Sequence, residues 1–137
     1  MKKVERQVEV LLESLIEVEI IQKVIDALPR GYISVKVISG HTYYYRQWRE
    51  GSKVVSAYVP ESYLNVVKQK IEIRKQNEAL LKILKAEYRK AEKQVLKSGN
   101  LTVEQIENVK AKIASLSEEE LEDRHAVVQN LINELLD

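Results

Sequence analysis

The sequence contains no cysteine, and its 137 residues include only four glycines, two prolines and one methionine. Without cysteine, the chain forms no disulfide, supplies no thiolate nucleophile and builds no cysteine zinc site. The absence favours an intracellular protein, and we predict a cytoplasmic location. The sequence also lacks any run approaching the roughly 20 apolar residues of a membrane-spanning helix, so we expect no membrane partner.

The common signatures of catalysis are also missing. The sequence has no G-x-x-x-x-G-K-[ST] phosphate loop, no G-x-G-x-x-G and no nucleophile elbow. Of its two histidines, His41 is expected in a turn, and His125 forms the one E-x-x-H pair with Glu122. Carboxylate di-metal bundles need a second such pair on other helices. We therefore predict a non-enzymatic protein with no metal, no cofactor and no small-molecule substrate.

The net charge is close to zero, because 22 lysines and arginines face 21 acidic residues. The charge is nevertheless unevenly distributed along the chain. Residues 32–99 have fourteen basic and six acidic side chains, a balance of +8, whereas residues 100–137 have three and nine, a balance of −6. Two interpretations of the basic central segment follow. It is either a binding surface for nucleic acid, or it forms surface ion pairs with the acidic C-terminal helices, which would then fold back on it.

Strand character is confined to one stretch, residues 31–61, with the sequence GYISVKVISGHTYYYRQWREGSKVVSAYVPE. Runs of β-branched and aromatic residues are separated there by turns at Ser39–Gly40 and Glu50–Gly51, which predicts two consecutive hairpins. Pro60 cannot donate to a strand ladder and is tolerated at the start of a helix, so it marks the end of the sheet. We predict a three-stranded antiparallel meander over residues 31–60.

The length of the two turns decides which half of the middle strand shares the apolar face of the outer strands. Two-residue loops would place Tyr44, Arg46 and Trp48 there. Three-residue loops would flip the middle strand, because a shift of one residue exchanges the faces, and would place the alternate half there, namely Tyr43, Tyr45 and Gln47. We favour the second register, because the first puts the Arg46 guanidinium in the middle of a buried face, where an unpaired charge is costly.

In the favoured register, the open face of the sheet carries aromatic rings interleaved with cations, namely Tyr32, Lys36, Tyr44, Arg46, Trp48 and Tyr58. Such a surface is suited to stacking on bases and to lying along phosphates. The same aromatic residues are also compatible with a core beneath a helix, because a small sheet needs cover to be stable.

Helix is predicted on both sides of the sheet. Residues 1–30 form an N-terminal helix, because apolar residues recur at steps of three and four before Pro29 ends the pattern. Residues 61–99 form a long helix, whose second half has the heptad spacing typical of a coiled coil. Residues 100–137 form a helical hairpin, in which capping boxes begin at Thr102 and Ser117.

The predicted fold class is therefore α+β and mostly helical, with the meander between an N-terminal helix and a long central helix, followed by the hairpin. At 137 residues, the chain is predicted to form a single domain. The long helix and the wide apolar stripes favour a homo-oligomer, most simply a two-fold dimer.

Four short motifs in the strand-rich stretch carry a family resemblance: Gly31–Ile33, Tyr43–Tyr45, Arg49–Lys53 and Tyr58–Glu61. They resemble the core of an uncharacterised family of small prokaryotic proteins, some of which are labelled as associated with transposases. Many members carry a cysteine-rich stretch before the tyrosines, where this chain has Ile38–His41, so no metal is inferred. A three-stranded sheet followed by a helix is also similar to the arm-binding domain of tyrosine recombinases, whose sheet lies in the major groove.

Two functional hypotheses follow. The first is a nucleic-acid-binding protein with DNA as its partner, in which phosphate contacts make binding sensitive to salt. Its predicted contact residues are Lys36, Tyr44, Arg46 and Trp48 on the sheet and Lys68, Lys70, Arg74 and Lys75 on the long helix. The second is a structural or adaptor protein, which acts through helical self-association or through binding of a partner helix.

Overall fold

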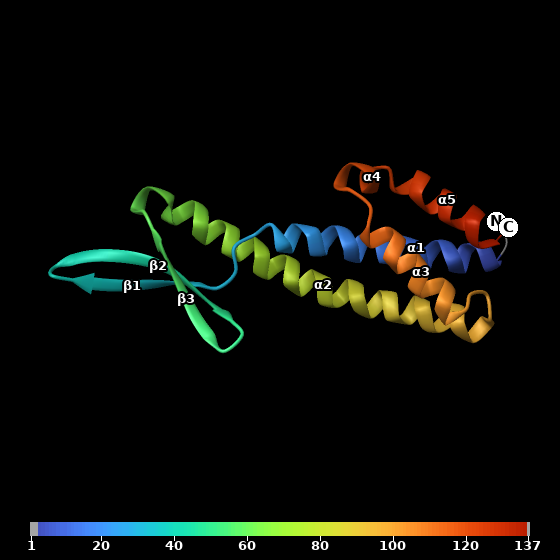
Figure 1. The fold of residues 1–137 in the computed structure, drawn as a ribbon, viewed down its shortest axis with the longest axis horizontal. Coiled ribbons are helices and arrows are strands. Elements are labelled where there is room, and N and C mark those ends of the chain that lie inside the picture. The colour runs from blue at the N-terminus through green and yellow to red at the C-terminus, as the bar shows by residue number, and fades with distance from the viewer. Residues whose placement is uncertain (1–2, 137) are drawn as a thin grey trace. The chain divides into compact units, whose positions relative to one another are not determined.

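The computed structural model of the chain describes residues 3–136 and shows a mostly helical α+β fold, as predicted (Figure 1). The elements are α1 (Lys3–Asp26), β1 (Tyr32–Ile38), β2 (His41–Glu50), β3 (Lys53–Val59), a short 3₁₀ helix η1 (Glu61–Tyr63), α2 (Leu64–Ser98), α3 (Val103–Ala114), α4 (Glu118–Glu122) and α5 (Arg124–Leu136). Among the described helices, none combines the length and the apolar character that a membrane crossing requires.

The chain divides into two compact units. Unit 1 comprises Met1–Lys23 and Leu80–Asp137, and unit 2 comprises Val24–Ala79. Unit 1 therefore holds most of α1, the second part of α2 and the three C-terminal helices, whereas unit 2 holds the sheet. The expectation of a single domain stays a prediction.

Unit 1 has a continuous apolar core. From α1 the core takes Val8, Leu11, Leu12 and Ile16, all of them 0 % exposed. Their spacing of three or four residues places them on one side of the helix, where they face apolar positions of the other helices. These partners are Tyr88, Ala91 and Val95 of α2, Ile106, Val109 and Ile113 of α3, Leu121 of α4, and Val128, Leu131 and Ile132 of α5.

The ends of these helices follow the predicted capping chemistry. Gly99 terminates α2 with φ 74°, and the backbone N–H of Asn100 donates to the carbonyl of Val95 over 3.2 Å. A capping box opens α3, since the Gln105 N–H donates to the Thr102 hydroxyl over 3.1 Å. The capping box predicted at Ser117 opens α4 in the same way. These local signals are confirmed.

The predicted helical hairpin is interrupted in its second half, which forms α4 and α5 rather than one helix. Asp123 leaves the helical conformation, with φ −89° and ψ 67°, and its carboxylate accepts from the backbone N–H of Ala126 over 3.3 Å. Aspartate competes with helix propagation in this way, because its side chain caps the helix that follows.

The sheet is an antiparallel meander of order β1-β2-β3. Ile38 pairs with His41 and Glu50 pairs with Lys53, so both turns are two-residue loops. The first loop has positive φ at both positions, 52° at Ser39 and 82° at Gly40, as a type I′ turn requires. The second loop begins with Gly51 at φ 62°, as in a type II′ turn.

The register that we favoured from the sequence is wrong. Val35 pairs with Tyr44 and Ala57 pairs with Arg46, so the even-numbered half of β2 shares the apolar face of the outer strands. The desolvation penalty assumed for Arg46 is reduced, because its guanidinium is only partly buried and has partners. It lies 3.8 Å from the centre of the Trp48 ring and donates to the Arg30 carbonyl over 2.8 Å.

Gly31, at the entry to the sheet, cannot be replaced without strain. Its φ is 102°, and a Cβ there would lie 2.0 Å from the carbonyl oxygen of Gln47. We expect Gly31→Ala to lower the free energy of unfolding by at least about 2–3 kcal/mol, because both the φ value and the overlap with backbone are unfavourable. The measurement is urea unfolding followed by Trp48 fluorescence, which reports on unit 2.

The matched control is Gly51→Ala. Gly51 also has a positive φ, 62°, but a Cβ there meets nothing within 4 Å. Its expected cost is about 1–2 kcal/mol, the penalty of the left-handed conformation alone. Equal costs at the two glycines would show that the approach of the Gln47 carbonyl does not constrain residue 31.

Candidate functional site

The observed register divides the side chains of the sheet into two chemically different faces. The tyrosine face consists of Tyr32, Ser34, Lys36, Ile38, His41, Tyr43, Tyr45, Gln47, Arg49, Val54, Ser56 and Tyr58. The tryptophan face consists of Ile33, Val35, Val37, Thr42, Tyr44, Arg46, Trp48, Glu50, Lys53, Val55, Ala57 and Val59. Both sets follow from the cross-strand pairs, because directly paired residues and residues two apart along a strand share a face.

The tyrosine face is aromatic, polar and open. Tyr32 is 56 % exposed and Tyr58 is 58 % exposed. The Tyr58 ring meets Tyr45 edge to face, with 5.9 Å between ring centres, and the Lys36 ammonium lies 4.8 Å from the centre of the Tyr45 ring. Together these residues form an aromatic surface, to which Lys36 and Arg49 add two cations.

A chain of polar contacts crosses this face from β1 to β3. The Tyr32 hydroxyl donates to the Gln47 side-chain oxygen over 2.7 Å, and the Gln47 amide donates to the Ser56 hydroxyl over 3.0 Å. Because Gln47 bonds to both neighbouring strands, it fixes the orientation of the Tyr32 ring. These hydrogen bonds connect the three strands across the tyrosine face.

The tryptophan face carries Arg46, in a different environment from the cations of the tyrosine face. The Arg46 guanidinium stacks on Trp48, and the indole N–H of Trp48 donates to Glu50 over 3.0 Å. Arg30 lies 3.8 Å from the same Glu50 carboxylate. Burial, followed by the positive charges of Arg30 and Arg74, lowers the pKa of Arg46 from its ordinary value. Arg46 and Trp48 therefore contribute to the internal packing of unit 2.

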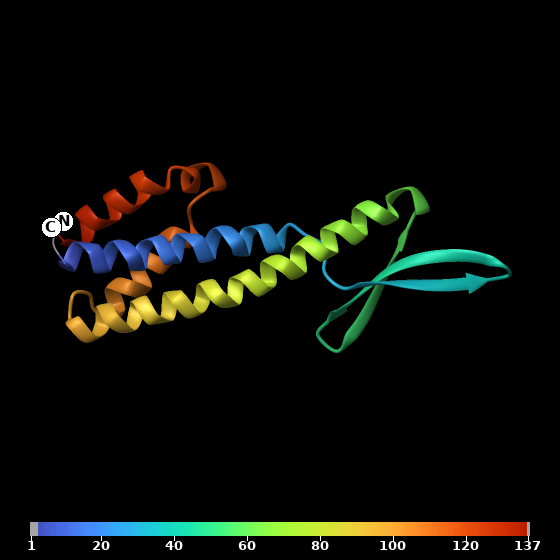
Figure 2. The same cartoon turned by 180° about the vertical axis from the view of Figure 1, so that it is seen from behind.

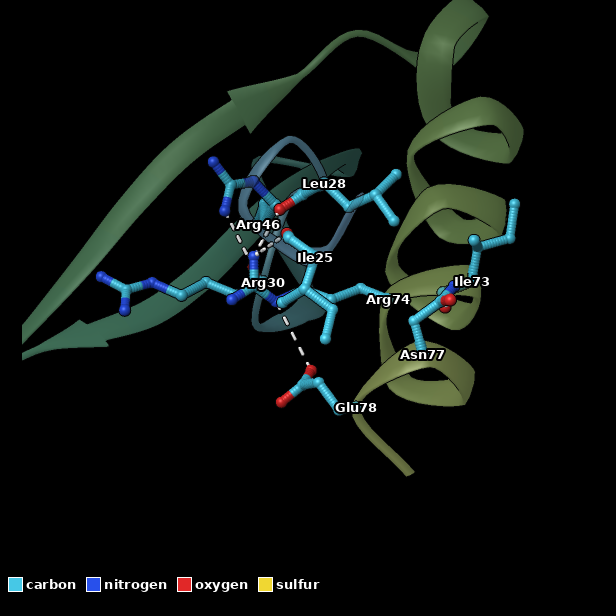
Figure 3. Close-up of polar contacts among 8 residues, drawn as sticks. All are labelled: Ile25, Leu28, Arg30, Arg46, Ile73, Arg74, Asn77 and Glu78. Atoms are coloured by element: carbon cyan, nitrogen blue, oxygen red, sulfur yellow. Dashed lines mark hydrogen bonds and ion pairs between the residues drawn. The ribbon is translucent and has the colours of Figure 1, made fainter. Parts of the chain in front are cut away.

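Arg74 closes the C-terminal end of α1 (Figure 3). Its Nη1 donates to the carbonyl oxygens of Ile25 and Leu28 over 2.8 and 2.6 Å, and its Nε lies 3.4 Å from a Glu78 oxygen. The last carbonyls of a helix have no partner within the helix and attract cations. Arg74 thus satisfies these carbonyls and ties the segment after α1 to α2 within unit 2.

A polar hollow of about 400 Å³ lies beside these arginines. Arg30, Arg46 and Arg74 line it, but so do Asp26 and Glu50. The guanidinium groups are directed at carbonyl oxygens, at a carboxylate and at the indole ring, so their hydrogen-bonding capacity is partly used within the protein. We do not assign an anion site here.

The structure does not bring the eight predicted contact residues onto one surface. Lys36 lies on the tyrosine face, whereas Tyr44, Arg46 and Trp48 lie on the opposite face. Arg74 is half-buried in the contacts described above. The other three predicted residues lie exposed on α2, namely Lys68, Lys70 and Lys75. Within residues 3–136 they form no ion pair.

Sequence reasoning missed the aromatic half of β2 that lines the open face. Tyr43, Tyr45 and Gln47 were assigned to the apolar face because the favoured register used three-residue loops. The signal that would have found them is in the turns, since Ser-Gly and Gly-Ser are suited to two-residue hairpin loops.

Unit 1 contains a second cluster of titratable groups, between α2 and α3. The Tyr88 hydroxyl donates to Glu92, and Lys110 lies 3.5 Å from Glu92 and 5.2 Å from the centre of the Tyr88 ring. Burial and the bond to Glu92 raise the pKa of Tyr88 to about 12. The cluster borders an apolar groove of about 380 Å³, whose walls include Leu15 and Ile113. It links two helices through paired charges and offers no activated nucleophile.

Within residues 3–136, no group of three or more histidine, cysteine, aspartate or glutamate side chains is arranged to hold a metal ion. The chemistry available in the described residues is therefore that of binding: exposed aromatic rings, amide and hydroxyl groups, and unpaired lysines.

A family model for a domain of unknown function, DUF6788, matches residues 1–69. The chain belongs to this family. The matched DUF6788 segment includes α1, the three strands and the first residues of α2, so both faces of the sheet lie within it. The prediction of an uncharacterised family is confirmed at this level. No curated protein and no solved structure matches the chain.

The raised pKa of Tyr88 predicts a specific alkaline destabilisation. A tyrosine in the unfolded chain ionises near pH 10, whereas folded Tyr88 keeps its proton to about pH 12. The unfolded state therefore loses this proton first, and the contribution of Tyr88 to stability falls as pH rises from about 10 to about 12. Absorbance of tyrosinate against pH should show one late step among the seven tyrosines.

Tyr88→Phe is expected to remove this late step and to reduce the loss of stability between these pH values. Tyr63→Phe, in η1 of unit 2, is the matched control and should leave the late step in place. A late step that persists in Tyr88→Phe would contradict the assignment.

Proposed function

We propose that this protein is a non-enzymatic nucleic-acid-binding protein, with DNA as the first partner to test, and that the tyrosine face is its contact surface. The observation that carries the proposal is the arrangement of four tyrosines and Lys36 on one open sheet face, where Tyr32 and Tyr58 are more than half exposed. Single-stranded nucleic acid is commonly bound by aromatic rings on a sheet, on which successive bases stack.

The polar residues of the face support the same function. Lys36 supplies a cation within reach of a phosphate, while Gln47 and Ser56 are hydrogen-bonded into a fixed pattern. Because the ring of Tyr32 is oriented before binding, less conformational entropy is lost when a base stacks on it. Tyr44, Arg46 and Trp48 lie on the opposite face, so they are not part of the same contact.

The charge of unit 2 favours a polyanion. Val24–Ala79 contains nine basic and five acidic side chains, a balance of +4. Three exposed lysines on the first part of α2 add phosphate-binding capacity, and they are Lys68, Lys70 and Lys75. The resemblance to transposase-associated proteins and to the sheet of the recombinase arm-binding domain is consistent with DNA. A cytoplasmic location belongs to the same proposal.

The test is fluorescence anisotropy of labelled single-stranded and duplex DNA at low and at physiological salt. Tyr32→Ala and Tyr58→Ala should each weaken single-strand binding by about 1–3 kcal/mol, the range measured for loss of one base–aromatic stack. Lys36→Gln should weaken binding chiefly at low salt, because it removes a phosphate contact.

Two matched controls test whether the loss of DNA affinity is specific to residues of the tyrosine face. Tyr63 is 61 % exposed but lies in η1, and Lys53 is exposed at the start of β3 with its side chain on the side of the tryptophan face. Tyr63→Ala should weaken binding by less than Tyr32→Ala or Tyr58→Ala, and Lys53→Gln should weaken it by less than Lys36→Gln. Absence of binding at low salt, or equal losses in variants and controls, would refute the proposal.

The second candidate function is that of a structural or adaptor protein, which acts as a homodimer formed by its helices. The observation that favours it is a row of exposed apolar side chains on α2, in which Val66, Ile73 and Leu80 recur every seven residues and are 47, 44 and 41 % exposed. The row supplies one apolar position in each heptad, half of the pattern that the seam of a coiled coil uses.

Sedimentation velocity over a range of protein concentrations tests this second candidate. We expect Ile73→Gln to weaken self-association, because it places an amide in the seam, whereas Val103→Gln on α3 should not. Val103 is a suitable control because it is apolar and 62 % exposed but lies on another helix. A monomer at all concentrations would exclude self-association through α2.

A further inference from the structure

The second part of α2, which belongs to unit 1, carries a row of cations along one side. We name this row the cationic stripe, and it consists of Lys82, Lys85, Arg89, Lys93 and Lys97. Successive members are three or four residues apart, so they lie one above another on the helix surface. At about 1.5 Å per residue, neighbouring members are about 5–6 Å apart along the axis, and the stripe is about 22 Å long.

The acid nearest to the stripe on α1 is engaged elsewhere, since Glu19 lines the same groove as Lys85 and Arg89 but lies 3.6 Å from Lys23. Within residues 3–136, none of its five members forms an ion pair; the acid of α2 that pairs in unit 1, Glu92, faces Lys110 of α3. Lys85, Arg89, Lys93 and Lys97 are each four residues from the next, and like charges at this spacing destabilise a helix by a few tenths of a kcal/mol per pair. The isolated chain thus carries a repulsion that an anionic partner would relieve.

The acidic C-terminal helices do not neutralise the stripe, although the sequence left this possibility open. Among the described residues, the ion pairs of α5 run to other helices: Arg124 pairs with Glu17 of α1, and Glu134 pairs with Lys112 of α3. In both views of unit 1, α1 runs between α5 and α2 (Figures 1 and 2). Within residues 3–136, no acid of α4 or α5 forms an ion pair with the stripe.

We propose that the cationic stripe binds the phosphate backbone of duplex nucleic acid, as a contact surface in unit 1 separate from the tyrosine face. A straight helix with evenly spaced cations suits a partner that is itself a regular array of negative charges. No exposed aromatic ring accompanies the stripe, since Tyr88 is 8 % exposed and is the one aromatic residue in this part of α2. Binding through the stripe is therefore electrostatic and independent of base sequence.

The proposal does not depend on base stacking by the tyrosine face. A duplex keeps its bases stacked on one another, so its binding to the stripe leaves the sheet unused. Removing cations from the stripe should lower the salt dependence of duplex binding, whereas removing tyrosines should lower single-strand affinity. The two proposals can therefore fail separately.

The test compares the full chain with the triple variant Lys85→Gln, Arg89→Gln, Lys93→Gln in anisotropy titrations of labelled duplexes of two unrelated sequences. Loss of three phosphate contacts should reduce the slope of log K against log salt by about 2–3, because each contact contributes about 0.9. At low salt the affinity should fall by at least about tenfold for both sequences. Far-UV circular dichroism checks that α2 remains helical.

A charge-matched triple variant is the control: Lys3→Gln, Lys53→Gln, Lys112→Gln. It lowers the net charge by the same amount but lies outside α2, so the slope should remain close to that of the unchanged chain. A second variant, Lys85→Arg, Arg89→Lys, Lys93→Arg, keeps the charges and should restore the slope.

Equal slopes for the stripe variant and the charge-matched control would overturn the proposal. So would the absence of duplex binding by the unchanged chain at low salt. Sedimentation velocity of both variants tests the alternative partner of the stripe, namely the acidic α4 of a second copy of the chain. If the stripe variant loses self-association while duplex binding is unchanged, the stripe is a contact between copies and the proposal is wrong.

Discussion

Two tight turns determine the chemistry of the sheet. Because each has two residues, every second side chain of β2 is directed to the same side as the apolar residues of the outer strands. One additional residue in either loop would turn the strands that follow it over, so the four tyrosines would no longer all share a surface with Lys36. The positive φ values of Ser39, Gly40 and Gly51 are thus the local condition on which the proposed binding surface depends.

The arginines and the lysines that were predicted to contact a partner have different roles in unit 2. Arg46 and Arg74 donate to backbone carbonyls and hold unit 2 together, as suits a planar group with several fixed donors. The lysines of α2 remain in solvent, where a compact charge on a flexible stem suits phosphate contacts. Of the cations predicted to bind a partner, the arginines thus have internal roles and the lysines stay accessible.

Much of the fold could be predicted from the sequence, because its signals are local. Helix periodicity, Pro29 and Gly99 as terminators, and the two capping boxes all involve residues within one or two turns of each other. The register was judged wrongly because it was decided on the burial of Arg46 and not on the Ser-Gly and Gly-Ser turns, which are suited to two-residue loops. The partners of Arg46 are Trp48 on the same strand and a carbonyl at Arg30, which the sequence alone does not bring together. Arg74 was misjudged for the same reason, since its acceptors lie 46 and 49 residues earlier in the chain.

The aromatic residues are distributed very unequally between the two units. The one tryptophan and six of the seven tyrosines lie in Val24–Ala79, and Tyr88 alone lies in unit 1. Ultraviolet fluorescence therefore reports mainly on unit 2. The helix signal in far-ultraviolet circular dichroism comes mainly from unit 1, which holds most of the helical residues. Cooperativity between the units is thereby measurable on the unlabelled chain. Coincident melting curves from the two signals would mean that both units unfold as one, and separated curves would mean that they unfold in different transitions.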